Sequence, residues 1–193
     1  KIMGAKSKTT EPGICTPFIV SWPGHIPPNS ISDALIDFTD MLPTFLDVAG
    51  AEEMPPNSID GKSFAGTLHD ISKPSQREWI LGMGGGNNAR LTEKGVENQY
   101  VFRDRVLRNQ QFKLYVGADR KPEKFFDLQS DPGENINLIN DLNTDDRKEN
   151  FALLTKAILT FPSHDSDPKY IPNPSQPWDV QVSAESQTWK KSK

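Results

Sequence analysis

The hydrophobic pattern of the first quarter of the chain predicts one strand followed by one helix. Residues 17–22 (Pro-Phe-Ile-Val-Ser-Trp) are apolar almost throughout, which is typical of a strand buried on both faces of a sheet. A helix is predicted between Asp40, which with Thr39 can cap it, and Gly50, which closes it. Its apolar face consists of Leu42, Phe45, Leu46 and Ala49. This pair is the pattern expected at the end of an α/β sheet.

A second pattern begins at Trp79, where short apolar runs alternate with turn-forming residues. Runs at 79–83, 100–107 and 112–116, with a last one around Phe126 and Leu128, predict an antiparallel sheet of about four strands. In the run 112–116 the apolar positions alternate with Lys113 and Tyr115, which predicts one buried and one solvent-exposed face.

A helix that begins at Thr144 and ends before Pro162 is predicted to cover the buried face of this sheet. Its packing stripe consists of Phe151, Leu154, Ile158 and Phe161. The fold class expected is therefore α/β with α+β: the last strand and helix of a large sheet, followed by a small four-stranded antiparallel subdomain with a packing helix. The expected divisions are 1–76, which includes a connecting loop from residue 51, 77–162, and an extended tail at 163–193.

Composition excludes several classes of protein. The net charge of −4 argues against a general nucleic-acid binder. No apolar run approaches the roughly 20 residues that a membrane-spanning helix needs. The single cysteine, Cys15, allows no disulfide within the 193 residues and no all-cysteine metal site.

The most informative segment runs from Lys6 to Gly24, where a polar, cationic loop leads directly into the apolar run and a Pro-Gly turn. Basic residues at the mouth of a buried strand suit an anionic ligand. Further motifs follow in order: Thr39-Asp40-Met41-Leu42-Pro43-Thr44, Asp60-Gly61-Lys62-Ser63, Arg105-Val106-Leu107-Arg108, Phe112-Lys113-Leu114, Phe126-Asp127-Leu128 and Asp131-Pro132-Gly133-Glu134. In order and spacing this set resembles the C-terminal portion of type I sulfatases, of the alkaline-phosphatase-like superfamily, across roughly residues 5–140.

The resemblance implies the hydrolysis of a sulfate ester, with a carbohydrate sulfate as the natural substrate. It also implies two cofactors, a formylglycine nucleophile and a calcium ion, both supplied by a part of the enzyme that precedes this chain. The partners expected are that N-terminal part and a sulfated small molecule or glycan, with neither nucleic acid nor membrane. The family is typically periplasmic or secreted. These 193 residues alone are expected to be inactive.

The resemblance also assigns site residues. In the family, the lysine five positions before the glutamate of Glu-Gly-Gly contacts the sulfate, and counting back from Glu11 gives Lys6. Its ammonium could neutralise a sulfate oxygen and stabilise charge on the leaving group. Lys8 is the second candidate. The chain departs from the family at two positions, with Thr10 in place of an aromatic residue and Pro12 in place of the first glycine.

Three further residues are candidates for substrate binding. His25 follows the predicted strand at a place where ligands bind in such sheets, although an exposed loop histidine is the simpler interpretation. Arg103 and Arg105 share one face of a predicted strand, so together they could hold an anionic sugar, or they could form surface ion pairs with Asp104. No metal ligands are predicted in this chain.

Two alternatives to a sulfatase remain open at this stage. A phosphatase or phosphonate hydrolase of the same superfamily could carry a similar C-terminal part. A non-catalytic binding or relic domain is the other alternative, because the chain has no nucleophile motif. Cys15-Thr16-Pro17 is followed by Phe18 where the Cys-x-Pro-Ser-Arg signature of the family requires serine. Cys15 is therefore interpreted as a small apolar residue.

Overall fold

The computed structural model describes residues 5–6, 8–51, 60–84, 89–92, 95–98 and 104–161. The chain divides into two compact units, 1–86 with 102–163, and 87–101 with 164–193. The second unit contains an antiparallel pair, β2 (Ala89–Thr92) and β3 (Gly95–Asn98), which the sequence pattern did not predict. The predicted boundary at residue 76 falls inside the first unit, and the predicted tail at 163–193 lies outside the described residues.

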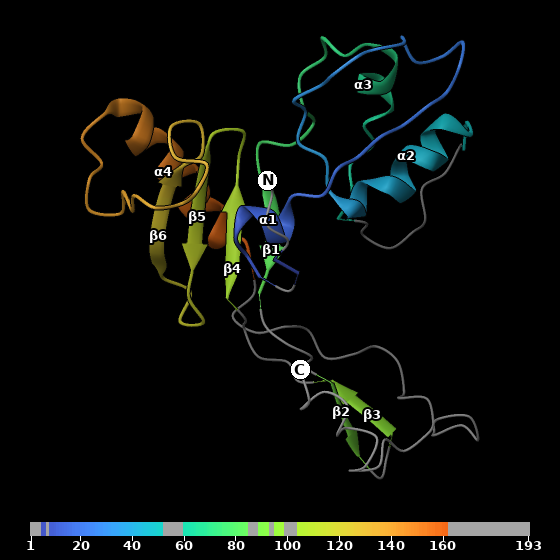
Figure 1. Ribbon diagram of the computed structural model, residues 1–193. Helices are drawn as coiled ribbons and strands as arrows, with labels where there is room; N and C mark the ends of the chain where they lie inside the picture. The colour runs from blue at the N-terminus through green and yellow to red at the C-terminus, as the bar shows by residue number, and fades with distance from the viewer. Residues whose placement is uncertain are drawn as a thin grey trace, which may run out of the picture. The chain divides into compact units, whose positions relative to one another are not determined.

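The first unit contains the predicted four-stranded antiparallel sheet. Its strands are β1 (Ile80–Met83), β4 (Arg105–Arg108), β5 (Phe112–Val116) and β6 (Pro122–Asp127), in the spatial order β1-β4-β5-β6 (Figure 1). The turn between β4 and β5 depends on Asn109, whose side-chain oxygen accepts hydrogen bonds from the backbone N–H groups of Gln111 and Phe112 at 3.0 and 2.6 Å. This side chain substitutes for a backbone turn, which is a common role of asparagine.

One face of the sheet is covered by helix α4 (Asp145–Ile158), as predicted (Figure 1). Thr144 caps the helix by accepting a hydrogen bond from Arg147 N–H at 3.3 Å, and acidic residues occupy the first turn. The core between helix and sheet consists of Leu107, Phe112, Leu114, Val116, Phe125, Leu138, Leu154, Ala157 and Ile158. The predicted stripe on α4 is thus confirmed.

The prediction that the opposite face of the sheet is exposed to solvent is wrong at Lys113. Its side chain on β5 has no solvent exposure, because the short helix α1 (Glu11–Ile14) lies over this face (Figure 1). The Ile14 side chain lies 3.2 Å from where a Cβ on Gly82 of β1 would be, and Glu11 pairs with Lys113. The sheet therefore has α4 on one face and the N-terminal loop on the other.

The predicted strand at 17–22 is extended, but within the described residues it pairs with no other strand. Its side chains are largely open to solvent: Phe18 is 49%, Ile19 92% and Val20 42% exposed. A strand that is apolar on both faces needs neighbours on both sides. The physical reason for the difference is that the described chain provides no such neighbour, and the apolar segment stays open.

The predicted helix exists as 3₁₀ helix η1 (Phe38–Asp40) followed by α2 (Met41–Val48), but its predicted apolar face does not pack. Leu42 is 51% and Phe45 66% exposed, whereas Pro43 and Thr44 on the other side are buried against the segment before α3 (Ala65–His69). Helix α3 lies within the region predicted as a connecting loop. Leu42 and Phe45 of α2, like Phe18, Ile19 and Val20, are thus apolar side chains that stay exposed.

The substitution Leu154→Ala tests the core between α4 and the sheet. Leu154 is fully buried, so truncation should lower the free energy of unfolding by about 2–5 kcal/mol in urea titrations. Leu159→Ala is the matched control, because Leu159 directly follows the helix and is 74% exposed. Equal effects of the two substitutions would contradict this packing.

Candidate functional site: the lysine loop and its anchor

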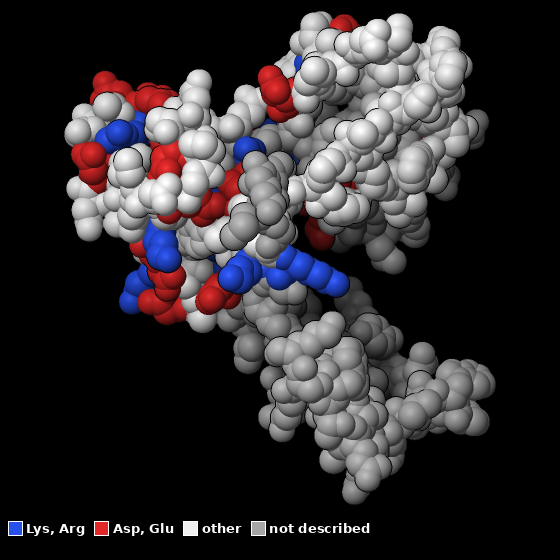
Figure 2. Space-filling view, viewed as in Figure 1, with Lys and Arg blue, Asp and Glu red and all other residues white. Residues whose placement is uncertain are grey.

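Lys6 and Lys8 lie in a tight turn just before α1, and both side chains are exposed. The turn is closed by a hydrogen bond from Lys8 N–H to the Ala5 carbonyl at 3.0 Å. Figure 2 shows basic side chains projecting from the surface next to α1. The loop therefore presents two ammonium groups to the outside of the unit, where an anion could reach them.

The turn rests directly on Gly13 of α1. A Cβ at this position would lie 2.6 Å from the Ala5 carbonyl oxygen and still closer to that of Lys8, so only glycine allows this approach. Pro12 occupies the first turn of α1, where the missing N–H has no consequence. The turn therefore requires the glycine at position 13, whereas position 12 tolerates proline.

Glu11 fixes the start of α1 to the sheet. Its backbone N–H donates to Glu134 Oε1 at 2.6 Å, and its carboxylate accepts from Lys113 Nζ at 3.1 Å and from Arg108 Nε at 3.1 Å. Lys113 Nζ also lies 3.0 Å from Glu134 Oε1. We call Glu11, Arg108, Lys113, Tyr115 and Glu134 the anchor cluster.

The remaining contacts of the anchor cluster involve Tyr115 and Glu134. The Tyr115 hydroxyl donates to Glu134 Oε2 and also lies 3.3 Å from the Thr9 carbonyl oxygen. Burial disfavours the charged form of Glu134, but hydrogen bonds from Tyr115, Glu11 N–H and Lys113 outweigh it and hold the pKa of Glu134 below its ordinary value. Burial and the Glu134 carboxylate raise the pKa of Tyr115, so its phenol stays protonated and remains a donor.

His25 lies in the turn after the extended segment and is exposed, as is His69 of α3. The ring of His25 stacks on Trp22 with a centroid distance of 4.0 Å, and its carbonyl accepts a hydrogen bond from His69 Nδ1 at 3.2 Å. These contacts hold the turn against α3. A role for His25 in substrate binding stays a prediction.

The two predicted arginines have different outcomes. Arg103 lies outside the described residues. Arg105 is only 5% exposed, because the register pairs it with Val116 on the side of the sheet that α4 covers. Its guanidinium lies 5.5 Å from the centroid of the Phe161 ring. The structure therefore contradicts the idea that Arg105 shares an exposed surface with Arg103, and we do not carry it forward as a sugar ligand.

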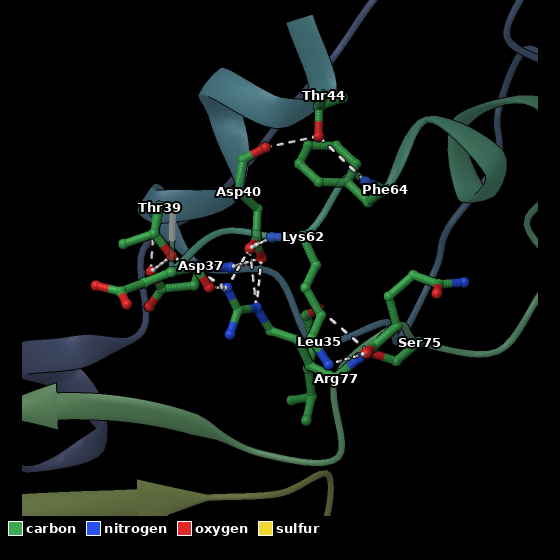
Figure 3. A network of polar contacts seen from close by, with 11 residues as sticks. Leu35, Asp37, Thr39, Asp40, Thr44, Lys62, Phe64, Ser75 and Arg77 are labelled. Carbon is green, nitrogen blue, oxygen red and sulfur yellow. Dashed lines mark hydrogen bonds and ion pairs between the residues drawn. The ribbon is translucent and has the colours of Figure 1, made fainter. Parts of the chain in front are cut away.

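A second polar cluster surrounds Asp40, which is 2% exposed (Figure 3). Its carboxylate accepts from Arg77 Nε at 2.8 and 2.9 Å, from the Lys62 backbone N–H at 2.7 Å and from the Asp37 N–H at 2.8 Å. Burial raises the pKa of Asp40, but the hydrogen bonds, above all from Arg77, hold it below its ordinary value of 3.8.

The Asp40 cluster brings two of the sequence motifs into contact. Gly61 lies against the Thr39 carbonyl, and a Cβ there would also come within 2.9 Å of Pro43 Cγ. The next residue, Lys62, offers its N–H to Asp40, and Thr44 Oγ1 accepts from Phe64 N–H at 3.1 Å. The motif residues from Thr39 to Thr44 and from Asp60 to Ser63 form a structural joint, with Asp40 fully occupied by protein donors.

No group of three or more His, Cys, Asp or Glu side chains suited to a metal ion occurs in the part of the chain that the structure describes. The calcium site that the resemblance implies is expected in another part of the enzyme, and it stays a prediction. Cys15 is exposed and directly follows α1. Among the described residues, no helix is long and apolar enough to cross a membrane.

Lys113, Tyr115 and Glu134 were missed as site residues by sequence reasoning. The alternation in β5 assigned Lys113 and Tyr115 to a solvent-exposed face, which is the usual place for a lysine. The signal available in the sequence was Glu134, the last residue of the Asp-Pro-Gly-Glu motif, together with Glu11.

Comparison with known proteins identifies the family. The family model described as N-sulphoglucosamine sulphohydrolase, C-terminal, matches residues 5–158. The chain belongs to the sulfatase family. Its match is to the C-terminal portion of type I sulfatases, as the motifs predicted.

Individual relatives agree with this assignment. An ulvan-active sulfatase of Formosa agariphila is 27% identical over 164 residues, covering 70% of this chain and 31% of the relative. An endo-4-O-sulfatase of Bacteroides thetaiotaomicron is 27% identical over 163 residues, covering 80% and 30%. The chain thus spans about a third of the length of these sulfatases.

A solved structure supports the fold. The crystal structure of the putative sulfatase yidJ from Bacteroides fragilis is 18% identical, with a TM-score of 0.52 over 72% of this chain and 28% of that one. The fold of the described sheet and helix is therefore shared with a solved sulfatase-like structure, as the predicted fold class requires.

The substitution Arg77→Met tests the Asp40 joint. It leaves a buried carboxylate without its cation, which should cost about 3–5 kcal/mol of the free energy of unfolding at pH 7. Because the pKa of Asp40 is lowered, the contribution of the pair is fully present above pH 3.8 and disappears as the pH falls through the lowered pKa. Denaturant titrations from pH 7 to pH 3 should therefore show the deficit shrinking in acid.

Arg147→Met is the control for this experiment, because Arg147 pairs with Asp141 at 2.8 Å on the surface. It should cost less than about 1 kcal/mol. A deficit in Arg77→Met that is equally small, or that does not change with pH, would contradict the joint.

Proposed function

We propose that this chain is the C-terminal part of a sulfatase that hydrolyses a sulfate ester on a carbohydrate, and that Lys6 is its sulfate-binding residue. The observation that carries the proposal is the loop itself. Lys6 lies exposed in a turn that is closed by the Ala5 carbonyl, seated on Gly13 and followed directly by the anchored Glu11. The backbone that carries Lys6 is thus held at several points, and its ammonium is exposed.

The chemical role of Lys6 follows from its charge. Hydrolysis of a sulfate ester builds negative charge on the leaving oxygen and keeps it on the sulfate. A positioned ammonium stabilises this charge at no reorganisation cost when the bond breaks. Lys8, in the same turn, is the alternative if the path of the loop places it nearer the sulfate.

The nucleophile and the metal are proposed to lie in another part of the enzyme. A formylglycine and a calcium ion held there would supply the nucleophile and the charge that polarises the sulfate, while this chain would supply the lysine and one wall of the cleft. The 193 residues alone are accordingly expected to be inactive.

The open apolar surface of the first unit supports docking against that N-terminal part. Residues 18–20 and the outer face of α2 are exposed, and a groove of about 810 Å³ runs along Phe18, Val20, Trp22, Ile31 and Phe64. A soluble protein rarely leaves so much contiguous apolar surface open. We propose that residues 17–22 pair as a strand with the sheet of the N-terminal part.

The choice of a carbohydrate sulfate is supported by the family and its relatives. The matching family is named for a sulfated glucosamine, and one relative is named for its action on ulvan. A periplasmic or secreted location, which is the expectation for this family, belongs to the same proposal.

Lys6→Ala in the full-length enzyme should lower kcat/KM for an aryl sulfate by about 10²–10³-fold, the loss typical of one removed electrostatic donor. Lys8→Ala is the matched control, because it removes the same charge from the same turn, and it should leave kcat/KM nearly unchanged. The measurement is initial-rate kinetics, with an aryl phosphonate monoester assayed in parallel.

Three other outcomes of these kinetic measurements would change the proposal. A large loss in Lys8→Ala alone would move the role to Lys8. No loss in either variant would show that the loop does not reach the sulfate. Faster turnover of the phosphonate ester than of the sulfate ester would contradict a sulfatase and favour a phosphonate hydrolase.

A further inference from the structure

A lysine with no solvent exposure lies at the centre of the anchor cluster. Lys113 Nζ is 3.1 Å from Glu11 Oε1 and 3.0 Å from Glu134 Oε1, and Arg108 neutralises the other oxygen of Glu11. Two carboxylates and two cations thus balance in charge. Burying charged groups costs free energy even when they pair well, and an apolar residue at position 113 would cover the sheet at lower cost.

The contacts of this cluster converge on one short segment, residues 9–11. The Tyr115 hydroxyl lies 3.3 Å from the Thr9 carbonyl oxygen, Glu134 accepts the Glu11 N–H, and Lys113 binds the Glu11 carboxylate. These three side chains come from β5 and from the turn after β6. The segment they hold directly follows the turn that contains Lys6 and Lys8.

Glu134 reaches this position through a strained backbone. Its φ is +55°, in the left-handed region that residues other than glycine seldom adopt. The preceding Asp131 stabilises the turn by accepting hydrogen bonds from the N–H groups of Asn135 and Ile136, both at 2.6 Å. Backbone strain that the surrounding structure maintains is frequent near functional sites.

We propose that Lys113, Tyr115 and Glu134 are positioning residues for the Lys6 turn. They touch neither substrate nor nucleophile; they fix the turn by holding Thr9 and Glu11 to the sheet. The role in catalysis rests on the proposed function of Lys6, whereas the anchoring of the loop does not. A displacement of about 1 Å in a catalytic group can cost about 10²-fold in rate, so such an anchor has a measurable effect.

The test uses Lys113→Met and Tyr115→Phe in the full-length enzyme. Lys113→Met removes the buried cation while keeping the length of the side chain, and Tyr115→Phe removes only the hydroxyl and is the milder change. Lys121→Met is the control, because Lys121 is an exposed lysine whose side chain is 79% accessible. Each substitution is made in the wild-type and in the Lys6→Ala background.

Two readouts are measured. Hydrogen exchange of the peptide covering residues 8–14 should accelerate by about 10-fold or more in both anchor variants, with the peptide covering β5 and β6 still protected. kcat should fall by about 10–100-fold in the wild-type background with little change in KM, and should not fall further in the Lys6→Ala background. Lys121→Met should change neither readout.

The outcomes separate the anchor from the function of Lys6. Unchanged exchange in residues 8–14 in both anchor variants overturns the inference. Losses of kcat that are equal in the two backgrounds also overturn it, because the cluster would then act independently of Lys6. If Lys6→Ala has no effect while exchange accelerates, the proposed role of Lys6 fails and the anchoring of the loop is supported.

Discussion

The buried ammonium of Lys113 connects the N-terminal loop of the first unit to the sheet that follows it. It binds carboxylates from α1 and from the turn after β6, which are separated by 123 positions in the chain. Without this cation, Glu11 and Glu134 would face each other as buried like charges, which is strongly unfavourable. The position of α1, of the turn on Gly13 and hence of Lys6 depends on this pairing.

The Asp40 cluster also holds two loop segments together, at the other end of the unit. There, Asp40 joins Arg77, Lys62 and Asp37, so the segment before α2 is held to the segment before α3. In both the anchor cluster and the Asp40 cluster, a buried carboxylate accepts hydrogen bonds from backbone N–H groups and from a cation. They fix loops in which prolines and short helices leave little regular hydrogen bonding, and the apolar side chains of residues 18–20 stay exposed.

The elements that the sequence predicted correctly are those that local periodicity determines. The antiparallel sheet and α4 with its stripe were predictable, because strand alternation and helix spacing are local signals. Lys113 was wrongly predicted to be exposed. Strand alternation shows that its side chain points away from the face that α4 covers, but it does not show that α1 covers the opposite face. Arg105 was misassigned for a different reason: its pairing with Val116 puts it on the face that α4 covers, and the sequence alone does not give this register. Residues 17–22 were predicted to be a buried strand because they are apolar almost throughout, and an apolar run does not show whether neighbouring strands are present. The Lys6 assignment came from motif order alone, and the structure adds the anchor.

The most direct test of this account is an experimental structure of the full-length enzyme with sulfate or orthovanadate bound. The account predicts that Lys6 Nζ lies about 3 Å from an oxyanion oxygen, a charge-assisted hydrogen bond. It also predicts that Glu11 is held by Lys113 and that the turn rests on Gly13. An oxyanion bound by other cations, with Lys6 in solvent while the anchor is intact, would contradict it.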